Sequence, residues 1–166
     1  MPTTVRIPLA LMTVQPDTGN AFWLATTRAT IDQGHVAFID GGLGIATWWG
    51  IIPSNVNATP AWNLEAYSEV DSGVGGNGVF SFDGRVIAHA TSLNGAYTSL
   101  LGGGTLLVQT AGLLTIMTAN ATNLDGTLVV SANSMLLVQF TRHGQVVGDT
   151  LAAQFNVLGM IMRIDL

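Results

Sequence analysis

Residues 61–70 read AWNLEAYSEV, and hydrophobic residues alternate with polar or amphipathic ones through most of the segment. The hydrophobic positions are Trp62, Leu64 and Ala66, and the positions between them are Asn63, Glu65 and Tyr67. Successive side chains of a β-strand point to opposite faces of a sheet. The segment therefore predicts a strand with one buried face and one wetter face.

Short apolar segments recur along the whole chain, and turn-forming dipeptides separate several of them. The dipeptides are Asp40-Gly41, Asp83-Gly84, Asn94-Gly95 and Asp125-Gly126, which accept the positive φ of a tight turn. The predicted strands are Val5–Val14, Ala21–Thr26, His35–Ile39, Ile45–Ile52, Ala61–Val70, Val79–Phe82, Arg85–Ala90, Thr105–Gln109, Leu113–Ala119, Thr127–Val130, Met135–Arg142 and Leu151–Ile164. This rhythm predicts an all-β, single-domain protein built largely from hairpins.

Two features predict surfaces that meet protein as well as water. Trp48 and Trp49 are adjacent in a predicted strand, so one should fill the core while the other covers a second surface. Leu151–Ile164 is apolar on both faces toward its end, although Leu151, Phe155, Leu158 and Met162 also fit one face of a helix. We favour a strand, and a strand that is apolar on both faces is usually covered on both.

Composition excludes several classes of protein. The chain has 166 residues, of which 48% are hydrophobic and only 9% are charged, so it is not intrinsically disordered. Five Arg, no Lys and a net charge of -5 argue against nucleic acid as a partner. The absence of Cys excludes thiol chemistry. The uncharged stretch 86–124 is interrupted by Gly, Asn, Gln and Thr, so we expect no membrane span.

Motifs that could indicate catalysis or cofactor binding have simpler explanations. Gly73–Gly78 matches G-x-G-x-x-G, but a strand and a turn follow where a dinucleotide site needs a helix. His35 and His143 adjoin glycines at predicted turns, and His89 lies in an apolar strand, so no metal-ligand spacing is present.

The acidic residues also argue against an active site. Glu65, Glu69 and Asp71 form the one acidic cluster, and solvation of the surface explains it. We therefore predict no enzyme activity, no catalytic residue, no metal and no cofactor, and we expect Asp149 to matter only by fixing the turn before the last strand.

Three segments resemble the small jelly-roll virion proteins of tailed bacteriophages, a group that includes capsid cement (decoration) proteins, head fibres and tail-fibre tips. They are Ala46–Pro53 with its Trp-Gly-x-x-Pro strand end, Ala61–Leu64, and the Gly-Asp-x-Leu turn of Gly148–Ala153. The resemblance implies an antiparallel jelly-roll β-sandwich that trimerises.

The resemblance implies a cement protein that binds the major capsid protein on the outer capsid surface of a virion. We divide the chain into an N-terminal arm, residues 1–15, and a jelly-roll domain, residues 16–166. The alternative is a receptor-binding or carbohydrate-binding module of a phage tail fibre or spike. The expected interface residues, with the capsid or with other copies of the chain, are Ile7, Leu9, Met12, Trp48, Trp49, Met160 and Met162.

Overall fold

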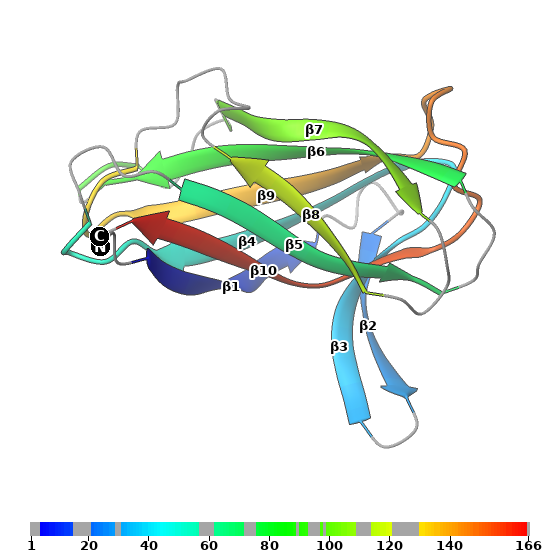
Figure 1. Ribbon diagram of the computed structural model, residues 1–166, viewed down its shortest axis with the longest axis horizontal. Helices are drawn as coiled ribbons and strands as arrows, with labels where there is room; N and C mark the ends of the chain where they lie inside the picture. Colours follow the sequence, from blue (N-terminus) through cyan, green and yellow to red (C-terminus); the bar gives the residue numbers. More distant parts are fainter. Residues whose placement is uncertain are drawn as a thin grey trace.

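The chain is an all-β, antiparallel jelly-roll β-sandwich (Figure 1). The computed structural model describes residues 4–14, 21–28, 31–56, 62–71, 76–88, 90–92, 97, 99–108, 114–120 and 130–165. Its strands are β1 (Thr4–Val14), β2 (Ala21–Arg28), β3 (Ile31–Phe38), β4 (Leu43–Ile51), β5 (Trp62–Val70), β6 (Gly76–Ile87), β7 (Ser99–Val108), β8 (Thr115–Asn120), β9 (Met135–His143) and β10 (Phe155–Asp165). Within the described part of the chain, no helix is long and apolar enough to cross a membrane.

Two layers pack face to face. In the front layer β5 lies between β8 and β10, and the other edge of β10 pairs with β3 at Phe155–Val157 and with β1 beyond it. The back layer has the order β1, β4, β9, β6, β7. The hairpin of β2 and β3 projects from the body of the sandwich (Figure 1).

The predicted N-terminal arm is part of both sheets. Residues 4–9 of β1 pair with β10, and after them Ala10–Val14 pair with β4 across a register shift. Separating residues 1–15 from the domain was therefore wrong for the described residues 4–14. These residues connect the two layers instead of extending away from them.

The predicted turn at Asp83-Gly84 is absent, and one strand runs through it. β6 continues from Gly76 to Ile87 because it pairs with β9 over Phe80–Ile87 and with β7 on its other edge. In the pairing with β7, the register shifts between Phe82 and Asp83, directly at this turn-forming sequence. The turn at Asp40-Gly41 is confirmed, with φ of 81° at Gly41, whereas Asn94-Gly95 and Asp125-Gly126 lie outside the described residues.

Five phenylalanines fill the space between the layers. Phe38 and Phe155 come from the front layer, and Phe80, Phe82 and Phe140 from the back layer. The ring of Phe140 is central, with its centroid 5.0 Å from that of Phe38 and 5.1 Å from that of Phe82. Such aromatic contacts add to the hydrophobic effect of burial and fix the relative position of the two sheets.

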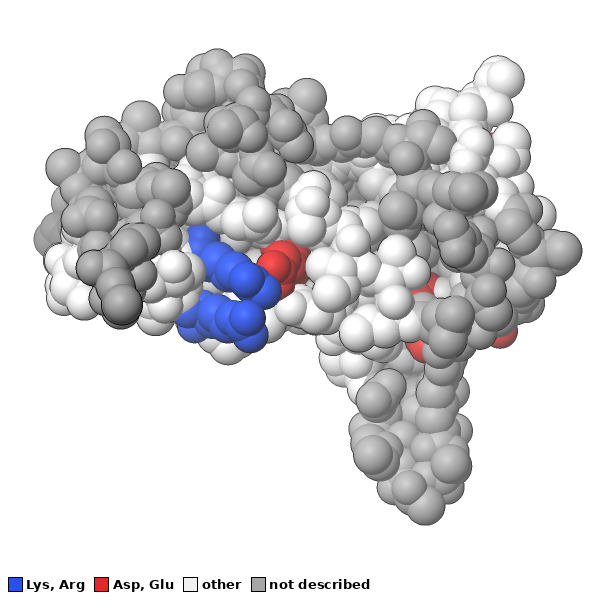
Figure 2. All heavy atoms as spheres, in the orientation of Figure 1, with Lys and Arg blue, Asp and Glu red and all other residues white. Residues whose placement is uncertain are grey.

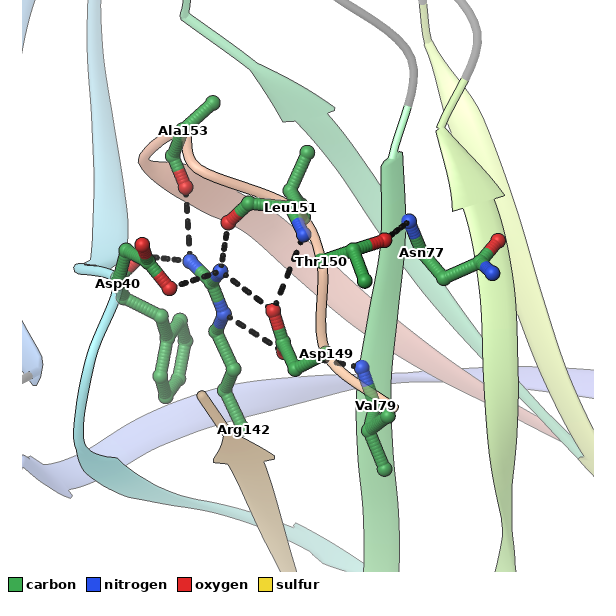
Figure 3. Close-up of polar contacts among 9 residues, drawn as sticks. Asp40, Asn77, Val79, Arg142, Asp149, Thr150, Leu151 and Ala153 are labelled. Carbon is green, nitrogen blue, oxygen red and sulfur yellow. Dashed lines mark hydrogen bonds and ion pairs between the residues drawn. The ribbon is translucent and has the colours of Figure 1, made fainter. Parts of the chain in front are cut away.

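Arg142 lies at one end of this core, and its side chain is completely buried (Figure 3). Its guanidinium donates to the carbonyl oxygens of Phe38 at 3.1 Å, Ala153 at 2.8 Å, and Leu151. It also forms an ion pair with Asp149 at 3.0 Å, whose side chain is equally buried. One side chain from β9 thus holds the end of β3 and the segment that leads into β10.

The predicted role of Asp149 at the turn before the last strand is confirmed. Besides Arg142, its carboxylate accepts hydrogen bonds from the backbone N–H of Val79 at 3.0 Å and of Leu151 at 3.3 Å. The backbone N–H of Thr150 and that of Leu151 both donate to the carbonyl of Asn77. Residues 151–154 therefore form a loop fixed by polar contacts, and the final strand begins at Phe155, later than predicted.

Candidate functional site

The outer face of the front layer carries a row of polar side chains across three strands. The register places Arg6 of β1 opposite Arg163 of β10, and Arg163 opposite Asn63 of β5. As residues 61–70 predicted, Trp62, Leu64 and Ala66 are buried in the core. Strand alternation therefore turns Asn63 and its alternate neighbours on β5 outward.

Glu65 is the centre of this polar face. Its carboxylate accepts a hydrogen bond of 2.7 Å from the Tyr67 hydroxyl and forms an ion pair of 2.8 Å with Arg163. The side chain of Glu65 is 10% exposed, and that of Arg163 is 37% exposed. In Figure 2 arginine side chains in blue lie directly beside an acidic group in red on this face. The three polar groups therefore hold one another in fixed positions.

Two polar atoms in the same row are buried and lack hydrogen-bond partners. They are Oδ1 of Asn63 and Nε of Arg163, which belong to residues directly opposite each other. A buried polar atom without a partner costs about 1–3 kcal/mol. Such atoms are rare in native proteins, and core packing does not require two of them on an outer sheet face. Their position makes this row the candidate site for a ligand.

The other end of the face is apolar and open. Gly159 lies opposite Tyr67, and Tyr67 lies opposite Ile116 of β8, which is 48% exposed. A Cβ built on Gly159 meets nothing within 4 Å, so there is open space beside the tyrosine. The face thus combines a charged end, a phenol group and exposed aliphatic surface. We call it the front polar face, and define it by Arg6, Asn63, Glu65, Tyr67, Ile116, Gly159 and Arg163.

A serine, a histidine and an aspartate meet on the outer face of the back layer. The Ser81 hydroxyl lies 2.9 Å from Nε2 of His143 and 3.5 Å from Oδ2 of Asp83. In a catalytic triad the carboxylate bonds to the imidazole and orients it toward the serine. Here the carboxylate contacts the serine itself, so these residues do not form a triad.

Burial raises the pKa of Asp83 above its usual value of 3.8, against the opposing effects of the Ser81 hydrogen bond and the His143 charge. A raised folded-state pKa contributes stability at low pH that is lost as pH rises through that pKa. We therefore expect Asp83→Asn to melt at a higher temperature than the wild type at about pH 7, and the difference to shrink below about pH 4. Thermal unfolding of both proteins at the two pH values tests this, and a variant that is less stable at neutral pH contradicts it.

The residues expected at an interface fall into two groups. Leu9, Trp48, Met160 and Met162 are between 1% and 7% exposed and pack in the core of a single subunit. The burial of Met160 and Met162 accounts for one apolar face of the last strand within the subunit. Ile7 packs partly buried against the same core. Trp49 is half-buried on the face opposite Trp48, as predicted, and Met12 is 57% exposed.

Other predicted residues also changed place. Glu65 and Glu69, expected to be solvated, are buried, whereas Asp71 is exposed. His35 is buried in β3 and not in a turn.

Only some of the residues in the histidine and glycine motifs lie within the described part of the chain. His143 ends β9 beside a turn, while His89 and residues 72–75 of the glycine-rich motif lie outside the described residues. Gly76–Gly78 open strand β6, so no helix follows the motif. Among the described residues there is no group of His, Asp and Glu that could hold a metal ion.

Trp23 is a feature that the sequence did not single out. It lies on the projecting hairpin, is 54% exposed, and rests against the backbone of Gly34. A Cβ at Gly34 would lie 2.2 Å from Cζ2 of the indole, so only glycine permits this contact. β2 pairs with β3 and not with the strands of the body of the sandwich. The alternation of residues along β2 therefore could not predict that the Trp23 side chain is exposed.

The fold resembles those of solved structures, although no protein-family model matches the chain and the curated proteins contain no similar sequence. The isomalto-dextranase of Arthrobacter globiformis T6, complexed with panose, superposes with a TM-score of 0.53 at 11% identity, over 96% of this chain and 23% of that chain. A CBM35 from Cellvibrio japonicus Abf62 superposes with a TM-score of 0.49 at 11% identity, over 96% and 92%.

The enzymatically active domain of tailspike protein 4 of bacteriophage CBA120 superposes with a TM-score of 0.38 at 9% identity, over 96% of this chain and 19% of that chain. The structural neighbours thus include carbohydrate-binding modules and a phage tailspike. At 11% identity the superposition on the isomalto-dextranase concerns the fold alone, and the sandwich itself follows from the strand pairing of this chain.

Proposed function

We propose that the chain is a non-catalytic glycan-binding module and that the front polar face is its binding surface. The observation that carries this proposal is the carboxylate of Glu65, held between the Tyr67 hydroxyl and the Arg163 guanidinium beside the open space over Gly159. This corresponds to the alternative that the sequence left open, a carbohydrate-binding jelly-roll module.

A sugar presents pairs of hydroxyl groups together with apolar C–H faces, and the front polar face offers a partner for each. The carboxylate and guanidinium can engage adjacent hydroxyls with charge-assisted hydrogen bonds. The ring of Tyr67 and the side chain of Ile116 supply apolar contact next to them. Because the polar side chains already bind one another, little conformational entropy is lost when a ligand arrives.

The same geometry argues against glycoside hydrolysis. Glycosidases place two carboxyl groups about 5–9.5 Å apart on either side of the scissile bond. Glu65 and Glu69 lie on the same face of one strand, four residues apart, and not on opposite sides of a bound sugar. Glu65 is also occupied by Arg163, so it is poorly placed to act as a general acid.

A glycan array with the purified chain tests the proposal. We expect binding to at least one class of glycan, and we expect Tyr67→Phe to weaken it about tenfold because the variant leaves Glu65 without one of its donors. Tyr97 is the other tyrosine of the chain and bonds to Thr47 of the back layer, so Tyr97→Phe is the matched control and should bind normally. If no glycan is bound, or if both variants behave alike, the proposal is wrong.

The place of the module in a virion rests on the sequence resemblance. We propose a tail fibre or spike as its location, since a glycan-binding module serves host attachment there. Nothing in the comparisons favours a capsid cement, and the described residues 4–14 of the predicted N-terminal arm form strand β1. The outer capsid surface, the coat-protein partner and the homotrimer stay predictions, and antibody labelling of intact particles distinguishes heads from tails.

A further inference from the structure

The front polar face has two chemically different ends. Arg6, Arg163 and Asn63 form one row across the strands, and Ile116, Tyr67 and Gly159 form another. The rows lie four residues apart along β5, a distance of about 13 Å. That distance is between backbones, and the Tyr67 hydroxyl and the Arg163 guanidinium both bind Glu65, so a single acidic glycan can contact both rows.

The charged row places two like charges directly opposite each other on an antiparallel pair. Arg6 and Arg163 are Cα partners in the ladder of β1 and β10, and like charges in that arrangement destabilise a sheet. Glu65 offsets the charge of Arg163 but not that of Arg6, because Nη2 of Arg163 contacts both carboxylate oxygens of Glu65. Pro8 and Ile161, the next pair along the ladder, are uncharged. Asp165 lies opposite Thr4 and not opposite Arg6.

Both arginines keep unused donors. Arg6 is exposed and makes no ion pair within the part of the chain that the structure describes. Nε of Arg163 lacks a hydrogen-bond partner, although the rest of its guanidinium binds Glu65. An anionic group beside the exposed Arg6 guanidinium would satisfy its donors and offset the repulsion between the two arginines, since guanidinium groups bind carboxylates and other oxyanions through charge-assisted hydrogen bonds.

We infer that the ligand is an acidic glycan, whose carboxylate or sulfate group binds Arg6 and Arg163 while a less polar part of the same molecule lies against Tyr67 and Ile116. This inference rests on the proposed glycan-binding function and adds the charge of the ligand and its orientation. The chain has a net charge of -5 and as a whole repels anions. A bound anion must therefore be held by the local pair of arginines.

Calorimetry with matched sugars tests the inference. The probes are trigalacturonate, its carboxyl-reduced neutral form, and sulfated galactotriose, and the variants are Arg6→Gln and Arg85→Gln. Arg85 is a partly exposed arginine of β6 in the back layer and serves as the control. We expect Arg6→Gln to weaken binding of an acidic trisaccharide about tenfold, to leave the neutral one unchanged, and to reduce the dependence of affinity on salt.

The possible outcomes separate the inference from the function on which it rests. Loss confined to the carboxylate probe or to the sulfate probe supports the inference and identifies the anion. If Arg6→Gln has no effect, or weakens the neutral and acidic sugars equally, or if only neutral glycans bind, the inference is wrong while glycan binding stands. If the wild type binds no glycan on the array, the proposed function fails, and the inference fails with it.

Discussion

Replacing Arg142 with methionine is expected to lower the free energy of unfolding by about 3–5 kcal/mol. The change leaves the carboxylate of Asp149 buried without its cation, and it removes the donors to the carbonyl groups of Leu151 and Ala153. A loss of this size is a large fraction of the stability of an ordinary domain. Urea unfolding followed by tryptophan fluorescence measures it.

The control for this prediction is Arg85→Met. Arg85 donates to the carbonyl of Ser92 in an exposed contact, so its replacement should change stability by less than about 1 kcal/mol. Adding Asp149→Asn to Arg142→Met should recover part of the loss, because it removes the uncompensated buried charge. If Arg142→Met unfolds at the same urea concentration as the wild type, the buried network does not hold the entry to β10.

Introducing aspartate at Met160 is expected to prevent the subunit from folding. Met160 is 2% exposed and packs in the core, and a buried carboxylate without a partner costs several kcal/mol. This outcome differs from what is expected of the interface residue that the sequence predicted, where an aspartate would weaken binding and leave the subunit folded. Circular dichroism and solubility of the variant measure the effect.

Met12→Asp is the matched control, since Met12 is 57% exposed on β1. We expect it to fold normally and to leave glycan binding unchanged. Should Met160→Asp instead yield a folded protein whose mass by light scattering is lower than that of the wild type, Met160 would be an interface residue and its burial in the subunit core would be wrong.

The parts of the fold that depend on local alternation were predictable. Residues 61–70 showed which side of β5 is buried, and Trp48 and Trp49 divided between core and surface as adjacent strand residues must. The role of Asp149 in fixing the turn before the last strand was predicted from its position directly after Gly148. These results share one cause, because each depends on residues that are neighbours in sequence.

The parts that depend on long-range pairing were not predictable. Asp83-Gly84 is a good turn sequence, but continuous pairing of β6 with β9 stabilises a strand there instead. The arm became a strand because β10, far away in the chain, pairs with it. The wetter side of β5 displayed Glu65 and Tyr67, yet nothing local indicated that Arg163, 98 residues from Glu65, would lie beside them.

The most direct test of the front polar face is an NMR titration of the wild-type chain with the glycan that binds most tightly on the array. Its five arginines give separate Nε–Hε signals that report on both layers. We expect the signals of Arg163 and Arg6 and the ring of Tyr67 to shift with ligand, while those of buried Arg142 and of Arg85 on the back layer stay in place. Shifts confined to Arg85 or to Trp23 of the projecting hairpin, with Arg163 and Tyr67 unchanged, would contradict the assignment of this face as the binding site.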